Sequence, residues 1–372
     1  MKLLLKNILP FDLFRRMLDE GYVRSQVHPL YPELVVFNYT EAAQFDRAWN
    51  EATNVCRGLV VRLANGVLDD DAEVLARPFN KFHNLNTAYV PETMEASLPD
   101  EAPLVTTKLD GSMGIVYSYD GQWWVATRGS FDSDQARRAT AWYRQHIAVG
   151  FPQNWPDGVT PVCEIIYPEN RIVVDYDFEG LVLLSMIENA TGRELARDEV
   201  EAWARVNVLQ IVDKFDKTLA ECAAENALNE EGYVLTYSNG VKVKVKFAEY
   251  VRLHRILTGL NPKAIWEMLA QNFGAGVDAI LADPKMPVTF IEWFKGWVDQ
   301  LRRKYAEIER EAQAVFAARP QSPVRKDQAL YFMQTPQHKS VLFAMLDGKD
   351  YAGIIWDRIA PKGNQTFKKD GE

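Results

Sequence analysis

The segment Lys108-Leu109-Asp110-Gly111-Ser112 carries the side chain best suited to covalent chemistry in this chain. A lysine, one variable residue and then Asp-Gly is the arrangement in which a lysine amine attacks the α-phosphate of a nucleotide. The amine is a nucleophile only when it is deprotonated, and a free lysine titrates near pH ~10.4. Burial or neighbouring cations must therefore lower the pKa of Lys108. Without such neighbours, so short a motif is more often a lysine beside an ordinary turn.

A lysine-rich run near residue 244 could supply those cations. Residues 241–247 alternate valine and lysine, and a period of two places Lys242, Lys244 and Lys246 on one face of a strand. Two further ammonium groups near Lys108 would lower its pKa by like-charge repulsion and would balance the charge on a reacting phosphorus. The alternative is an exposed edge strand whose lysines discourage aggregation.

Two glutamates stand where a carboxylate needs an explanation. Glu231 directly precedes a strand-like run, and a carboxylate beside phosphates usually means magnesium held through oxygen ligands and water. An acidic loop is the alternative. Glu164 lies alone in the apolar run 161–166, where an acidic residue is rarely buried without a partner. A ribose hydroxyl or a structural arginine could be that partner.

Cationic groups that could bind phosphate occur in three further segments. Arg57 leads into a strand-like run, Lys81 lies among aromatic residues in 77–83, and Arg128 ends a strand before Gly129-Ser130. An arginine offers phosphate a planar fork, and a lysine offers it a point charge. Each of these residues taken alone is more often structural.

The elements that must position these side chains are predicted to be mixed strands and helices. Strand-like runs occur at 34–37, 58–62, 114–119, 123–127, 172–175, 181–187 and 233–237. Asn65-Gly66, Asp120-Gly121 and Asn239-Gly240 are typical of tight hairpin turns. Helices are predicted at 132–148, 197–206 and 216–228. The pattern is that of an antiparallel-sheet-rich α+β domain.

Helices dominate the last third of the chain, so we expect a domain over residues 1–250 and a smaller all-α domain over residues 251–372. Pro287 precedes the longest helix, in which apolar residues from Ile291 to Val315 recur at steps of three and four. Packing along a helical bundle is favoured over a dimeric coiled coil. Pro320 is expected to end this helix.

The composition excludes several classes of protein. A hydrophobic content of 47% and a charged content of 25% are ordinary for a soluble globular chain, and no apolar run approaches the ~20 residues of a membrane span. Three separated cysteines, and an N-terminus interrupted too early for a signal peptide, favour the reducing cytoplasm.

The net charge is −9, but 18 basic against 14 acidic residues give residues 251–372 a net charge of +4. Contact with a polyanion must therefore rest on local basic clusters.

Taken in order, the motifs resemble the bacteriophage RNA ligase 1 family of covalent nucleotidyltransferases over roughly residues 34–255. The resembling segments are Cys56-Arg57-Gly58, 77–82, 108–112, Arg128-Gly129-Ser130, Glu164 with 168–173, 187–192, 231–234 and 244–246. The chain departs from the family pattern at Arg128, where a lysine is expected, and at His83, where an aromatic is expected. Phe37 or Tyr39 could take the place of a family tyrosine near the triphosphate.

The resemblance implies an adenylyltransferase domain followed by a helical domain, and an ATP-dependent RNA ligase that needs Mg²⁺. The lysine would take AMP from ATP, pass it to an RNA 5′-phosphate, and a 3′-hydroxyl would then displace AMP. The implied substrate is single-stranded or nicked RNA, with tRNA repair as the expected setting and a monomer as the expected state. The implied site residues are the nucleophile Lys108, the phosphate ligands Arg57, Lys81, Arg128, Lys244 and Lys246, the ribose ligand Glu164, the magnesium residue Glu231, the turn residue Gly111, and Tyr39.

Two other classes of protein share parts of this pattern. DNA ligases and mRNA-capping guanylyltransferases carry the same lysine motif, but a small β-barrel usually follows their lysine strand, and here helices follow. A non-catalytic nucleotide-binding or RNA-binding protein would have little reason to keep Lys108, Glu231, Lys244 and Lys246 together.

Overall fold

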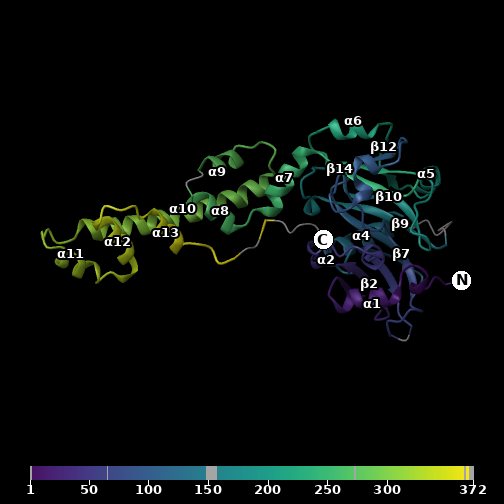
Figure 1. Cartoon of the computed structure of the whole chain (residues 1–372), viewed down its shortest axis with the longest axis horizontal. Coiled ribbons are helices and arrows are strands. Elements are labelled where there is room, and N and C mark those ends of the chain that lie inside the picture. Colours follow the sequence, from purple (N-terminus) through teal and green to yellow (C-terminus); the bar gives the residue numbers. More distant parts are fainter. Residues whose placement is uncertain (1, 65, 148–156, 272–273, 364–365, 368–372) are drawn as a thin grey trace. The chain divides into compact units, whose positions relative to one another are not determined.

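The computed structural model describes residues 2–64, 66–147, 157–271, 274–363 and 366–367 (Figure 1). Contacts divide the chain into one unit that ends at Arg252 and a second that begins at Leu253. This division lies two residues from the predicted boundary at residues 250 and 251. The first unit contains all the predicted site residues, so it is described first.

Three sheets form the first unit. The first sheet has the order β1 (Val23–Val27), β2 (Leu34–Tyr39), β3 (Arg57–Arg62), β4 (Glu73–Ala76). The second has the order β11 (Gln210–Ile211), β10 (Gly180–Glu188), β9 (Val159–Ile166), β7 (Ser112–Tyr119), β8 (Gln122–Thr127). The third has the order β12 (Lys214–Phe215), β6 (Leu104–Thr107), β13 (Gly232–Thr236), β14 (Lys242–Lys246), β5 (His83–Asn84). Pairing is antiparallel except for β10 with β11 and β14 with β5.

Strand β2 shows how the first two sheets pack, because all six of its residues are buried. Phe37 on one face joins the core beneath the helices α1 (Phe11–Asp19) and α3 (Glu51–Val55). Val36 on the other face packs against Ile115 of β7. A strand with both faces buried reads as a continuous apolar run rather than as an alternating one.

The remaining helices of this unit cover the sheet edges and faces. They are α2 (Glu41–Phe45), α4 (Asp134–His146), α5 (Arg197–Val206) and α6 (Leu219–Ala224), and α7 (Ala248–Gly259) runs across the division into the second unit. Helices α4 and α5 contribute Tyr143 and Val200 to the core of the second sheet. The architecture is therefore mixed helix with antiparallel-rich sheets, as the sequence predicts.

Most predicted elements are confirmed, and one is wrong. Six of the seven predicted strands correspond to β2, β3, β7, β8, β10 and β13, and the helix at 197–206 is α5. The predicted helix at 216–228 is shorter, and residue 148, the predicted end of another helix, lies outside the described residues. The segment 172–175 forms no strand; its valine N–H groups bind the Asp110 carboxylate instead.

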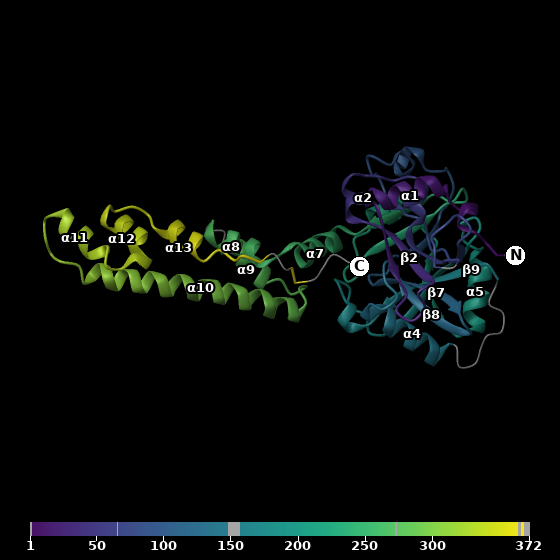
Figure 2. The same cartoon turned by 90° about the horizontal axis from the view of Figure 1, so that it is seen from below.

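Every element assigned among residues 260–271 and 274–363 is a helix. These helices are α8 (Pro262–Ala270), α9 (Gly274–Leu281), α10 (Val288–Ala317), α11 (Arg325–Phe332), α12 (Lys339–Leu346) and α13 (Ala352–Arg358), with one short 3₁₀ turn (Pro336–His338). The long helix α10 begins directly after Pro287, as predicted, and runs beside α8, α12 and α13 (Figure 2). Phe294, Val298 and Leu301 of its apolar seam are buried inside this unit, which favours the bundle interpretation.

None of the described helices has the length and apolar character needed to cross a bilayer.

Candidate active site around Lys108

Strand pairing places Lys108 beside Glu231. Lys108 directly follows β6, and its backbone N–H donates to the Gly232 carbonyl at 2.8 Å. On the other side of β13, Gly232 is paired with Lys246 of β14. Glu231 therefore lies between two lysines: Lys108, which follows β6, and Lys246, the last residue of β14.

Both carboxylate oxygens of Glu231 bind ammonium groups. Lys108 Nζ lies 2.7 Å from Glu231 Oε2, and Lys246 Nζ lies 2.9 Å from Glu231 Oε1. The Glu231 side chain is only 3% exposed. Gly232 has a φ of +139°, and a Cβ there would lie 2.0 Å from the Val245 carbonyl oxygen, so only glycine fits between Glu231 and β14.

The pKa of Lys108 is raised, which corrects the prediction that the lysine strand lowers it. Burial does act to lower this pKa, but the carboxylates of Glu231 and then Glu164 outweigh burial. The three lysines of β14 do share one face of the strand. However, Lys246 forms an ion pair with Glu231, and Lys242 lies 2.5 Å from Glu194, so each of these two lysines has its own carboxylate partner. In this structure Lys108 is held as an ammonium.

The repulsion expected at Lys108 falls on Lys244 instead. Burial is the main reason that the pKa of Lys244 is well below its usual value, followed by repulsion from Arg57, Lys108 and Lys81. The Lys244 ammonium lies 4.5 Å from the centre of the Phe82 ring.

Asp110 anchors the motif rather than facing the substrate. Its Oδ2 accepts hydrogen bonds from the backbone N–H groups of Val173 at 2.8 Å and Val174 at 2.9 Å. Its Oδ1 accepts from the Tyr250 hydroxyl at 2.8 Å. Sequence reasoning missed Tyr250, since nothing in its local pattern distinguishes it from a core tyrosine.

Gly111 is required for a different reason from the one predicted. It lies outside the positive-φ conformation that makes glycine necessary in tight turns. A Cβ at Gly111 would instead lie 2.6 Å from the Ile165 carbonyl oxygen, so β9 approaches too closely for any side chain. The Gly111 N–H donates to Glu164 Oε1 at 3.0 Å. The motif and β9 are thereby joined at the point where Glu164 enters the site.

The buried carboxyl of Glu164 has a pKa raised to about 7. Burial is the largest cause; Lys108 opposes it, and the nearby carboxylates of Glu231 and Asp110 reinforce it. Within the described part of the chain, this carboxylate accepts a hydrogen bond from the Gly111 amide and forms no ion pair with the structural arginine that the sequence left open.

Three of the predicted phosphate ligands surround Tyr39. Arg128 Nη1 donates to the Tyr39 hydroxyl at 3.1 Å, and Lys81 Nζ lies 5.1 Å from the centre of the Tyr39 ring. Arg57 and these two cations lower the pKa of Tyr39, although burial alone would raise it. Of the two candidates for this position, Phe37 is excluded because it packs in the core.

We refer to Arg57, Lys81, Arg128 and Lys244 as the cation cluster. Burial lowers the pKa of Arg57 and of Lys81, and repulsion within the cluster lowers both further. Arg57 Nη1 is buried and has no hydrogen-bond partner among the described residues. A buried donor without an acceptor is costly, and a phosphate oxygen would satisfy it.

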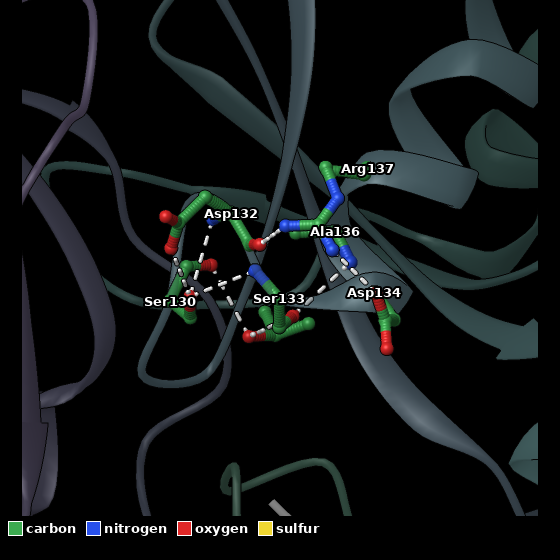
Figure 3. Close-up of polar contacts among 7 residues, drawn as sticks. Ser130, Asp132, Ser133, Asp134, Ala136 and Arg137 are labelled. Atoms are coloured by element: carbon green, nitrogen blue, oxygen red, sulfur yellow. Dashed lines mark hydrogen bonds and ion pairs between the residues drawn. The ribbon is translucent and has the colours of Figure 1, made fainter.

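Local hydrogen bonds order the turn that follows Arg128 and leads into α4 (Figure 3). Ser130 Oγ accepts from the backbone N–H groups of Asp132 at 3.1 Å and Ser133 at 3.0 Å. Ser133 then caps α4 by accepting from the Ala136 N–H at 3.2 Å. The small residues that follow Arg128 in the sequence thus form the N-terminal cap of α4.

Arg77, which lies in one of the resembling segments, has a structural position. Its buried guanidinium donates to the carbonyls of Asn189 at 3.1 Å and Ala190 at 3.2 Å. A Cβ at Gly192, whose φ is +75°, would lie 2.5 Å from Arg77 Nη2. Arg77 therefore supports the loop that follows β10.

No group of three or more histidine, cysteine or acidic side chains able to hold a metal ion occurs within the described part of the chain. Magnesium is often held by one or two carboxylates together with substrate phosphates rather than by a protein cage. The carboxylates of Glu164 and Glu231 beside the cation cluster fit that second arrangement.

Comparison with known proteins gives related sequences and less similar structures. The "RNA ligase" of Rhodothermus phage RM378 is 24% identical over an alignment of 388 positions, and the match covers 86% of this chain and 86% of that one. A solved structure of a Naegleria gruberi RNA ligase mutant with ATP and Mn is 20% identical with a TM-score of 0.34, and the match covers 41% of this chain and 51% of that one. A "Putative ATP-dependent DNA ligase" from Aquifex aeolicus is 12% identical with a TM-score of 0.44, covering 92% of this chain and 100% of the other.

A family model also matches the part of the chain that contains the site. Residues 55–250 match the model described as RNA ligase. That stretch contains Lys108 and both glutamates near its amine, together with the whole cation cluster. A match over more than half of the chain makes this protein a member of the bacteriophage RNA ligase 1 family.

Proposed function

We propose that this chain is an ATP-dependent RNA ligase that joins a 5′-phosphate to a 3′-hydroxyl through lysyl-AMP and RNA-adenylate intermediates. The observation that carries the proposal is the position of the Lys108 amine, 2.7 Å from a buried carboxylate and within electrostatic reach of the cation cluster. An amine placed beside a site for phosphates is the geometry that nucleotidyl transfer to lysine requires.

In the first step, Lys108 Nζ would attack the α-phosphorus of ATP. The new P–N bond forms as the bond to the pyrophosphate oxygen breaks, and the attacking amine loses one proton in addition to the ammonium proton that must leave first. Lys108 must lose its ammonium proton before it can attack, although Glu231 and Glu164 raise its pKa. A divalent cation held by the ATP phosphates near these two carboxylates would supply the positive charge that lowers this pKa.

The cation cluster would hold the phosphates. Arg57, Lys81 and Arg128, gathered at Tyr39, would bind the β- and γ-phosphates and stabilise pyrophosphate as it leaves. Lys244 and Lys246 would contact the α-phosphate. The ion pair with Glu231 positions Lys246 before ATP binds, and Lys244 lies among cations whose repulsion a phosphate would relieve.

The later steps would use the same residues. A 5′-phosphate oxygen of RNA would attack the phosphorus of lysyl-AMP, the P–N bond would break, and Lys108 would take back both protons and return to the ammonium form. An RNA 3′-hydroxyl then attacks the 5′-phosphorus, loses its proton and releases AMP. Glu164 would hold the ribose throughout, and Glu231 would serve the magnesium-dependent steps.

The setting we propose is cytoplasmic repair of single-stranded or nicked RNA, including tRNA, by a monomer. Residues 251–372, with a net charge of +4, would form an all-α domain that bears on the choice of RNA.

The test is incubation with α-labelled ATP and magnesium. The wild-type chain should acquire a covalent, acid-labile label, and Lys108→Ala should acquire none. Labelling by GTP alone would indicate a capping guanylyltransferase, and no labelling at all would refute the proposal. A second assay compares sealing of 5′-phosphorylated single-stranded RNA, a nicked tRNA anticodon loop and nicked duplex DNA. Sealing of the DNA alone would indicate the DNA ligase alternative.

A further inference from the structure

Four aromatic rings form a row that starts at Tyr39 and ends at the surface. The ring centres of Tyr39 and Trp49 are 5.1 Å apart, those of Trp49 and His83 5.5 Å, and those of His83 and Tyr89 5.9 Å. Each ring meets the next at an angle of 75° to 87°. We call these residues the aromatic row. Its inner ring, Tyr39, is 4% exposed, and its outer ring, Tyr89, is 43% exposed.

Cations lie at both ends of the aromatic row. At the inner end, Lys81 Nζ is 5.1 Å from the centre of Tyr39 and 4.8 Å from that of Trp49. At the outer end, the guanidinium of exposed Arg47 lies 4.5 Å above the Tyr89 ring. Between them, burial and the cations Lys81 and Lys244 lower the pKa of His83 to about 4, so its ring is neutral at physiological pH.

The backbone holds the outer end of the row in place. Arg47 has a φ of 55°, which a residue with a side chain rarely adopts, and its carbonyl accepts from the Trp49 N–H at 2.7 Å. The loop that carries Tyr89 begins where the Leu85 N–H donates to the Lys244 carbonyl at 2.9 Å. Tyr89 is therefore held relative to a member of the cation cluster.

Resting on the proposed function, we infer that the aromatic row binds the first nucleosides of the 5′-phosphorylated RNA strand. Once pyrophosphate has left, the cation cluster is the site available to the RNA 5′-phosphate, and the strand must continue from there towards solvent. The aromatic row leads from Lys81 to the surface, where the ring of Tyr89 is exposed to a base. Bases of any sequence stack on aromatic rings, and an arginine guanidinium adds a second planar surface.

The adenine of ATP is a poor alternative occupant. The α-phosphorus must reach Lys108 Nζ, while Lys81 at the row's inner end belongs to the group proposed for the β- and γ-phosphates. The adenosine then extends from the α-phosphate towards Glu164, away from the phosphates that the row adjoins.

The test measures the KM for 5′-phosphorylated single-stranded RNA when it accepts AMP from the pre-labelled protein. Tyr89→Leu removes the aromatic face, and we expect the KM to rise about tenfold, equivalent to ~1.4 kcal/mol. Tyr89→Phe keeps the face and should behave as wild type. Arg138→Ala is the matched control, because Arg138 lies 4.4 Å above the ring of Tyr167, outside the row. Arg47→Ala should raise this KM while Arg138→Ala leaves it unchanged.

A modified RNA separates stacking from general damage. RNA whose first two 5′ nucleotides lack bases should show a KM about tenfold higher with the wild-type protein and no further rise with Tyr89→Leu. Labelling of Lys108 by ATP should remain normal in Tyr89→Leu, which shows that the variant is folded.

The outcomes distinguish this inference from the proposed function. If the wild-type chain takes no label from ATP, the proposed function fails. If it takes the label and transfers AMP, but Tyr89→Leu has the wild-type KM for RNA, only the inference is overturned. A tenfold rise in the KM for ATP with an unchanged KM for RNA would also overturn it, since the row would then hold adenine.

Discussion

Replacing Glu231 by glutamine should make the Lys108 amine more reactive in the absence of ATP. The carboxylate lies 2.7 Å from Lys108 Nζ and is, after burial, the strongest influence on the pKa of that lysine, which it raises. At an effective dielectric constant of ~20, opposite charges at this separation attract by roughly 6 kcal/mol before desolvation is counted. Even a quarter of that energy exceeds the ~1.4 kcal/mol that corresponds to tenfold in an equilibrium.

The assay is competitive acylation of lysines by a trace of acetic anhydride, read by mass spectrometry at Lys108 from pH 7 to 10. We expect Glu231→Gln to raise the rate at Lys108 at least about tenfold at pH 8. Glu194→Gln is the matched control, because it removes the carboxylate 2.5 Å from Lys242 on the same sheet and should leave Lys108 unchanged. Adenylylation should nevertheless fall, since Glu231 also positions the amine for attack.

The same substitution should reduce stability. It leaves Lys108 and Lys246 without their shared counter-charge, and breaking a buried ion pair from one side costs about 3–5 kcal/mol. Urea unfolding at pH 7 measures this loss.

An unchanged or slower acylation rate at Lys108 in folded Glu231→Gln would refute the claim that Glu231 holds the amine protonated.

Four further predictions use other parts of the site. The pKa of Glu164 is raised to about 7, so ionisation of this carboxyl destabilises the folded state as pH rises from about 4.5 through 7. Glu164→Gln should therefore have a free energy of unfolding about 1–3 kcal/mol higher than wild type at pH 8 and little higher at pH 4. Urea unfolding at the two pH values measures this difference. Lys244→Ala should cut adenylylation at least about a hundredfold with the fold intact, while Lys242→Ala, on the same strand face, should stay within a few-fold. Gly111→Ala should lose about 2 kcal/mol or more of stability, because its Cβ would meet the Ile165 carbonyl at 2.6 Å; a melting temperature equal to that of wild type would count against the close approach. Removing divalent cations should abolish labelling of Lys108 while ATP still binds, as equilibrium dialysis can show.

The sequence was sufficient to predict which side chains of β14 share a face, but not what each one meets. The period of two correctly places Lys242, Lys244 and Lys246 together. Their partners come from distant segments: Glu194 follows β10, and Glu231 precedes β13. Since the sign of a pKa change depends on the nearest charge, a count of lysines gave the wrong direction for Lys108.

The wrong strand at 172–175 has a similar origin. Its valines satisfy the local pattern of a strand, but strand formation also needs a neighbour that accepts its N–H groups. Those of Val173 and Val174 are taken by the Asp110 carboxylate, 63 and 64 residues earlier in the chain. A local pattern cannot reveal a competing acceptor at that distance.

Negative and positive side chains occupy different parts of the site, and this separation gives a reason why a metal ion would be needed. Carboxylates gather near Lys108, while the cation cluster gathers at Tyr39 and Phe82. A triphosphate alone would satisfy the cluster but would bring more negative charge towards Lys108 and hold its proton still more firmly. A triphosphate that carries a divalent cation would suit both halves, because the cluster would hold its phosphate oxygens and the carboxylates of Glu164 and Glu231 would attract its cation. The electrostatic task of the metal would thus be to release a proton that the protein itself retains, which also keeps the lysine unreactive until its substrate arrives.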